Sequence, residues 1–208
     1  MIIIVPTAKE LNGIFGKINL QEWKYGILEG TWRGFRVFVS GITKTNASFA
    51  SGIILSELKP EKALITGICG AYRQSGLKVG EIVSVEKDWF VDESVFLGNE
   101  IRLLEEEGFA VCKNSHVCFE PFAGLKVASS NTVSLLSSTD ELAKIYQEKT
   151  KAEIENMEGA SIGLSAQRLG VNISQVRSVS NFCGKRDMQE WDIKLALGSL
   201  NLFFHKMF

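Results

Sequence analysis

The sequence is poor in proline and histidine and has no excess of charge of either sign. Its 208 residues include three prolines and two histidines, and 23 basic residues balance 24 acidic ones for a net charge of −1. A basic excess is the electrostatic footprint of binding to nucleic acid or to an anionic membrane surface. The composition therefore predicts a small-molecule substrate as partner, with no nucleic acid and no membrane.

Long hydrophobic runs and paired cysteines are also missing. No stretch approaches the ~18 uncharged apolar residues that a membrane span needs, and no basic region precedes the apolar start MIIIV, unlike in a signal peptide. The four cysteines form no CxxC pair, and the histidine spacing does not suit zinc. These absences predict a cytoplasmic protein with reduced thiols, no metal and no cofactor. A Cys118–His116 nucleophile pair is conceivable, but no local pattern supports it.

Strand-like and helix-like segments alternate along a chain of ordinary globular composition, 45% hydrophobic and 23% charged. The expected strands lie at 2–5, 36–40, 63–66, 81–86, 125–129, 152–156 and 173–180, and the expected helices at 8–15, 43–58, 101–107, 140–149, 157–169 and 192–204. The length suits one domain spanning 1–208. The alternation predicts an α/β fold whose sheet is mostly parallel near the start and more mixed in the middle.

In such sheets a ligand binds beyond the carboxyl ends of the strands. The segments that follow predicted strands are 7–10, 67–72, 156–158 and 180–187. Among them, GICGAY at 67–72 predicts a glycine turn that lets the backbone approach a flat ligand. A tight turn without a ligand would explain the same glycines.

The polar residues of these segments also have purely structural interpretations. Glu158 could favour a helix N-terminus through the helix dipole, or its two oxygens could bind two vicinal ribose hydroxyls. Glu10 could be a helix-surface carboxylate, and Arg186 and Asp187 could form a surface pair beside a buried Trp191. Taken singly, the residues leave these alternatives open.

Taken together and in order, the segments resemble the purine nucleoside phosphorylase and methylthioadenosine nucleosidase superfamily. The likeness covers essentially the whole chain through TAKE at 7–10, GITKTNA at 41–47, ITGICGAY at 65–72, LKVGEIV at 77–83, ENMEGAS at 155–161 and VRSVSN at 176–181. GICGAY, NMEGAS and SNFCGKRDMQEW at 180–191 look like the futalosine hydrolase branch. The resemblance implies a single three-layer α/β/α domain with a central twisted mixed sheet, in a homodimer or higher homo-oligomer.

The resemblance also implies roles for individual residues in hydrolysis of an N-glycosidic bond. Glu10 matches the carboxylate that activates the attacking water, and Asn181 matches the position that binds the purine near N7. The implied substrate-binding residues are Ile68, Cys69, Gly70, Val133, Asn156, Met157 and Glu158. Arg186 is assigned to the benzoate of futalosine, because a guanidinium suits bidentate binding of a carboxylate.

The chain departs from neighbouring branches in two respects, at the base and at the phosphate. Methylthioadenosine nucleosidases carry Asp where this chain has Asn181, whose amide can donate to a 6-oxo group and accept from a protonated N7. Phosphorylases bind phosphate through the positions where this chain has Ile65 and Ile68. Isoleucine cannot bind an anion, so water is the expected nucleophile.

The expected reaction is therefore the release of hypoxanthine from futalosine in menaquinone biosynthesis. One alternative is a nucleosidase that releases adenine from methylthioadenosine, S-adenosylhomocysteine or aminodeoxyfutalosine. The other is a nucleoside-binding protein without catalysis.

Overall fold

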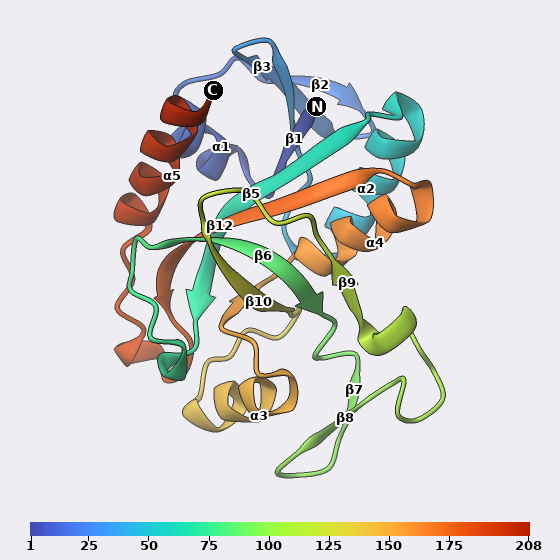
Figure 1. The fold of residues 1–208 in the computed structure, drawn as a ribbon, viewed down its shortest axis with the longest axis vertical. Helices are drawn as coiled ribbons and strands as arrows, with labels where there is room; N and C mark the ends of the chain where they lie inside the picture. The colour runs from blue at the N-terminus through green and yellow to red at the C-terminus, as the bar shows by residue number, and fades with distance from the viewer.

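A ten-stranded mixed sheet forms the centre of the computed structural model, which describes residues 1–208 (Figure 1). Its strands are β1 Ile2–Val5, β2 Gln21–Lys24, β3 Ile27–Trp32, β4 Phe35–Val39, β5 Lys62–Ala71, β6 Ile82–Trp89, β9 His116–Cys118, β10 Lys126–Thr132, β11 Ile154–Asn156 and β12 Asn172–Phe182. They run in the spatial order β11-β10-β6-β12-β5-β1-β4-β3-β2, with β9 paired to β6. A separate pair consists of β7 Ser94–Phe96 and β8 Ile101–Leu103.

Five helices flank the sheet: α1 Ala8–Phe15, α2 Thr43–Leu58, α3 Asp140–Thr150, α4 Gly159–Leu169 and α5 Ile193–Met207. Helix α1 packs on α5 at one side of the sheet, and α2 packs on α4 at the other (Figure 1). No helix is both long enough and apolar enough to cross a membrane.

The first strand shows why the molecule has three layers. Ile2 and Ile4 belong to the apolar core that includes residues of α2 and α4, whereas Ile3 and Val5 belong to the core that includes residues of α1 and α5. Successive side chains of a strand point to opposite faces, so this continuous apolar run requires cover on both sides. The predicted α/β/α architecture is confirmed.

Strand directions confirm a mixed sheet, but its first part is not mostly parallel, because β3 pairs antiparallel with both β2 and β4. Strand β1 runs parallel to both β4 and β5, and β12 runs parallel to β5 but antiparallel to β6. The parallel strands β1, β5 and β12 therefore bring their carboxyl ends to the same edge of the sheet.

Three local predictions are wrong. Residues 101–107 do not form a helix, because 101–103 pair with β7 as strand β8 and the Leu103 amide then donates to the Glu106 side chain in a turn. GICGAY is not a turn, because β12 pairs with β5 as far as Ala71 and keeps its backbone extended. The helix expected from 157 begins at Gly159. Strands β2 and β3 were not predicted.

The packing of α5 gives a prediction for stability. Phe204 is fully buried and packs against the rings of Phe15, Phe203 and Phe208. Phe204→Ala should therefore lower the free energy of unfolding by about 3–5 kcal/mol. Leu202 on the same helix is 74% exposed, and Leu202→Ala should change it by less than about 0.5 kcal/mol. Urea unfolding of both variants measures the difference. Equal losses would contradict this account of the core.

Candidate active site

A cavity of about 190 Å³ opens at the carboxyl ends of β1, β5, β11 and β12. Its lining includes every predicted site residue except Val133, namely Glu10, Ile68, Cys69, Gly70, Asn156, Met157, Glu158, Asn181 and Arg186. Val133 is fully buried in a separate apolar cluster with Tyr72 and Tyr146. The strand ends singled out in the sequence therefore meet at one place.

Glu10 is a buried carboxylate held in a fixed orientation, not a surface residue of α1. Thr7 caps the helix by accepting a hydrogen bond from the Glu10 amide at 3.1 Å, and its hydroxyl donates to Glu10 Oε2 at 2.7 Å. The Ile68 amide donates to Glu10 Oε1 at 3.0 Å. A Cβ on Gly67 would lie 2.8 Å from this oxygen, so only glycine leaves room for the carboxylate.

Glu158 stands at the N-terminus of α4, but its side chain makes no capping hydrogen bond. The Asn156 side chain caps the helix instead, accepting from the amides of Glu158 and Gly159 at 2.9 and 2.7 Å. The Glu158 carboxylate is thus free to face the cavity, where Oε1 accepts from the Thr43 amide at 3.3 Å. The structure does not support the interpretation of Glu158 as a side-chain cap.

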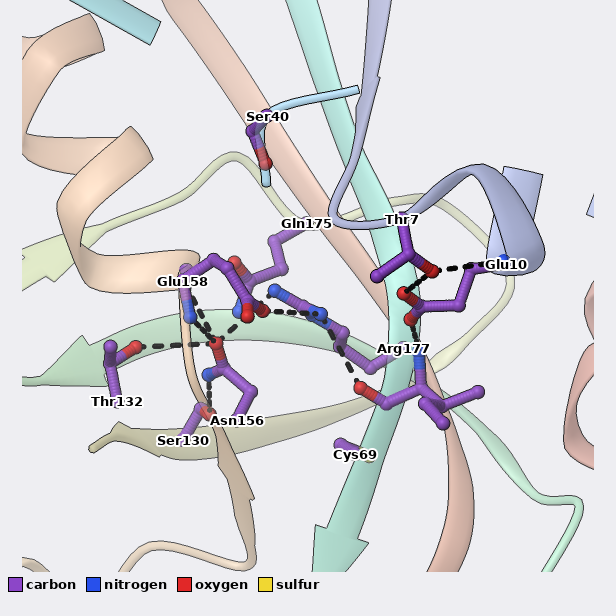
Figure 2. A network of polar contacts seen from close by, with 12 residues as sticks. Thr7, Glu10, Ser40, Cys69, Ser130, Thr132, Asn156, Glu158, Gln175 and Arg177 are labelled. Carbon is purple, nitrogen blue, oxygen red and sulfur yellow. Dashed lines mark hydrogen bonds and ion pairs between the residues drawn. The ribbon is translucent and has the colours of Figure 1, made fainter. Parts of the chain in front are cut away.

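Arg177 is fully buried and lies between the two carboxylates (Figure 2). Its Nη1 is 3.6 Å from Glu158 Oε2 and donates to the Ile68 carbonyl at 3.4 Å, while Nη2 donates to Asn156 Oδ1 at 3.2 Å. Burial raises the pKa of Glu158 to about 7, although the Arg177 charge lowers it and the nearby Glu10 charge raises it further. Sequence reasoning missed Arg177, yet an arginine in the apolar strand ISQVRSVS was an available signal, since arginine is rarely buried unless paired.

A second buried network orients Asn156 from behind. Asp88 is fully buried and accepts hydrogen bonds from Thr132 Oγ1, Asn156 Nδ2 and Gln175 Nε2, each at 2.8 Å. Burial raises the pKa of Asp88, and these three donors lower it. Because Asn156 Nδ2 also donates to Ser130 at 2.7 Å, both ends of its amide are engaged by protein groups. Asn156 therefore positions Glu158 and Arg177 from the cavity wall.

Asn181 follows an irregularity in β12 and faces the cavity from its far end. The register with β5 shifts between Val179 and Asn181, and such bulges re-aim side chains. Its Oδ1 accepts from the Ser180 hydroxyl at 2.8 Å, and its Nδ2 donates to the Phe182 carbonyl at 3.0 Å. Each amide group keeps capacity for one more hydrogen bond.

Cys69 and Gly70 form the floor of the cavity beside Asn181. Burial raises the pKa of the Cys69 thiol to about 12, so it stays protonated and is no nucleophile at neutral pH. A Cβ on Gly70 would lie 2.9 Å from Cys183 Sγ, so glycine makes room for this sulfur, which also lines the cavity.

The mouth of the cavity is lined by Arg186, Trp191 and Leu136. Asp187 pairs with Lys185 at 3.6 Å, not with Arg186, and Trp191 is 47% exposed. The interpretation of an Arg186–Asp187 pair beside a buried Trp191 is therefore wrong. Arg186 has no hydrogen-bond or ion-pair partner within the chain, and its guanidinium is available to a ligand.

The burial of Glu158 predicts a pH dependence of stability. The folded protein holds this proton up to about pH 7, whereas the unfolded chain releases it near pH ~4.3. As the pH rises through this window, the Glu158 contribution should lower the free energy of unfolding by roughly 3 kcal/mol. Glu158→Gln should remove that fall, which urea unfolding between pH 4.5 and 7.5 would measure. The same flattening in Glu61→Gln, which removes an exposed carboxylate, would argue against it.

Comparison with known proteins agrees with this geometry. The family model described as the phosphorylase superfamily matches residues 17–203. The futalosine hydrolase of Thermus thermophilus is 35% identical, with 96% of this chain and 91% of that protein covered.

Among solved structures, the 5'-methylthioadenosine/S-adenosylhomocysteine nucleosidase of Helicobacter pylori with butyl-thio-DADMe-Immucillin-A matches with a TM-score of 0.79 at 17% identity, covering 99% of this chain and 95% of that one. The futalosine hydrolase of the same organism gives a TM-score of 0.76 at 17% identity, with the same coverage. These two likenesses show the fold. The chain belongs to the phosphorylase superfamily and, within it, to the family of the Thermus futalosine hydrolase.

Proposed function

We propose that the protein hydrolyses the N-glycosidic bond of futalosine, releasing hypoxanthine and leaving dehypoxanthine futalosine for menaquinone biosynthesis. The observation that carries the proposal is the convergence of two buried carboxylates, Glu10 and Glu158, on one cavity that has Asn181 at its far end and an unpaired Arg186 at its mouth. The 35% identity to a futalosine hydrolase supports this choice of substrate. The proposed setting is the cytoplasm, in a homodimer or higher homo-oligomer.

Glu10 is the proposed general base. Cleavage of a glycosidic bond proceeds through an oxocarbenium-like state, and water attacks the anomeric carbon from the face opposite the leaving base. Thr7 and the Ile68 amide hold the Glu10 carboxylate in one orientation, from which it can take a proton from that water. The water oxygen forms the new bond to the anomeric carbon, and the electron pair of the broken C–N bond passes to the purine. A proton taken up from solvent at N7 lets the purine leave as neutral hypoxanthine.

Glu158 is the proposed ligand of the ribose hydroxyls, with Met157 packed against the sugar. An ionised carboxylate offers both oxygens as acceptors to two vicinal hydroxyls, whereas protonation turns one of these oxygens into a donor. Burial raises the pKa of Glu158 to about 7, and the Arg177 charge favours the ionised form. Two further donors from the bound ribose would favour the ionised form again.

Water is favoured over phosphate as nucleophile by the charges around the reaction centre. Glu10 and Glu158 would both repel an anion, and the buried Arg177 is already paired with Glu158. Ile68 offers no charge, and Ile65 is fully buried outside the cavity.

Arg186, Trp191 and Leu136 suit the benzoate end of futalosine. Trp191 and Leu136 are 47% and 37% exposed and offer apolar surface to an aromatic ring. The guanidinium of Arg186 can bind the carboxylate through two parallel hydrogen bonds. The thioether tail of methylthioadenosine carries no carboxylate, so it offers Arg186 no partner at this mouth.

Release of the free base tests the proposal. Chromatography should detect hypoxanthine from futalosine at a rate independent of added phosphate, with less base from aminodeoxyfutalosine, methylthioadenosine and inosine. Glu10→Gln should lower kcat by about 10²–10⁴-fold because the water loses its base. Adenine as the main product would favour an adenine-releasing nucleosidase, and tight binding of nucleosides without turnover would favour a binding protein.

A second variant tests the mouth of the cavity. Arg186→Ala should raise KM for futalosine by about tenfold or more and leave KM for inosine unchanged, because only futalosine carries the carboxylate. Lys185→Ala is the matched control, since it removes the neighbouring charge that pairs with Asp187. Equal effects of Arg186→Ala on both substrates would contradict the assignment.

A further inference from the structure

Glu155 is a third buried carboxylate in the lining of the cavity, and the reaction described above gives it no role. It is 4% exposed and lies on β11, one strand away from the glycine floor. A buried carboxylate that faces a ligand cavity restricts which ligand groups can lie opposite it, because an ionised carboxylate only accepts hydrogen bonds.

Three donors hold the Glu155 carboxylate. The Ser137 amide donates to Oε1 at 2.9 Å, and the hydroxyls of Ser137 and Tyr72 donate to Oε2. Tyr72 Oη itself accepts from Asn131 Nδ2 at 3.0 Å, which leaves its own hydrogen for Glu155. Burial raises the pKa of Glu155 and the Asp92 charge adds to the rise, which the hydrogen bonds from Ser137 and Tyr72 oppose. The geometry matches an ionised carboxylate, because three donors point at its two oxygens. Oε1 has one donor only, so it can accept another.

The strand register places Glu155 and Asn181 on either side of the same glycine. Gly70 of β5 is the partner of Glu155 on β11 and of Asn181 on β12. Partners in neighbouring strands point to the same face, and two strand spacings of about 4.8 Å put their Cα atoms roughly 10 Å apart. A Cβ at Gly70 would lie 2.9 Å from Cys183 Sγ and 3.4 Å from Asn181 Nδ2, so the glycine makes room for the Cys183 thiol on this face. The cavity thus has a polar side chain on each side of Gly70, Asn181 and Glu155, and both line it together with Cys183.

We propose that Glu155 determines the base specificity of the site by accepting a hydrogen bond from the N1–H of a 6-oxopurine, while Asn181 binds its O6 and N7 side. The inference rests on the proposed function, because it assumes that the base occupies the floor at Gly70. Hypoxanthine carries a hydrogen on N1, and adenine carries a lone pair there. The carboxylate therefore attracts the first base and repels the second.

Glu155 discriminates where Asn181 alone cannot. The amide of Asn181 has one donor group and one acceptor group, so rotation by about 180° would let it serve a 6-amino base as well as a 6-oxo base. An ionised carboxylate has no donor, and the three hydrogen bonds from Ser137 and Tyr72 fix its position. Opposite adenine, the remaining acceptor site of Glu155 Oε1 would face the N1 lone pair with no hydrogen between them, which is the situation that gives strong discrimination.

Binding of free bases tests the proposal without depending on turnover. Calorimetry should show wild-type protein binding hypoxanthine at least about tenfold more tightly than adenine or 1-methylhypoxanthine, which lacks the N1 hydrogen. Glu155→Gln should reduce the preference for hypoxanthine over adenine by about tenfold or more, because a glutamine amide can donate to N1 of adenine. Glu153→Gln is the control, since Glu153 lies outside the cavity and binds the Ser129 amide. It should leave the preference unchanged.

An unchanged preference in a folded Glu155→Gln variant would overturn the inference. If that variant does not fold, equal affinity of the wild type for hypoxanthine and 1-methylhypoxanthine would overturn it instead. Hypoxanthine release from futalosine together with an unchanged preference keeps the proposed function and rejects the role of Glu155. Loss of the preference in a protein that cleaves no futalosine keeps the role of Glu155 and rejects the proposed function. No binding of hypoxanthine by the wild type would reject the role of Glu155.

Discussion

The charge of Arg177, buried inside the sheet, is the interaction on which the rest of the site depends. Burying a carboxylate without a counter-charge is costly, and Glu158 and Asp88 are both buried with Arg177 lowering the pKa of each. The guanidinium binds Glu158 directly and reaches Asp88 through Asn156. One cation thus supports the carboxylate that faces the cavity and the network that holds it from behind. Removing it would leave two buried negative charges with hydrogen bonds alone.

The sequence was sufficient to predict the layers and the edge of the sheet where the site lies. Alternating elements and the apolar run at 2–5 indicated a sheet covered on both faces, and the segments after the strands held Glu10, Glu158 and Asn181. Local sequence patterns predicted the wrong backbone conformation where pairing with a distant strand determines it. The backbone at 67–71 is extended because β12 lies beside it, and 101–103 is a strand because β7 pairs with it. Arg177 and Glu155 were missed for the same reason, since their partners come from strands and loops far away in the chain.

The cavity combines two chemical environments along β5. At one end Gly67 makes room for Glu10, and at the other Gly70 makes room for the Cys183 thiol beside Asn181. A Cβ at Gly67 would first meet the Glu10 carboxylate, and a Cβ at Gly70 would first meet the Cys183 sulfur. The end with Glu10, Arg177 and Glu158 is dominated by charge, and the end with Asn181 and Glu155 by hydrogen-bonding groups held in fixed directions. A single strand sets the distance between these two ends.

The main chain of Ile68 connects Glu10 and Arg177. Its amide donates to Glu10 and its carbonyl accepts from Arg177, while its side chain lines the cavity without a polar contact. A substitution at this position changes the side chain but cannot delete either backbone hydrogen bond. The side chain at this position can therefore change while Glu10 and Arg177 keep the backbone contacts that hold them.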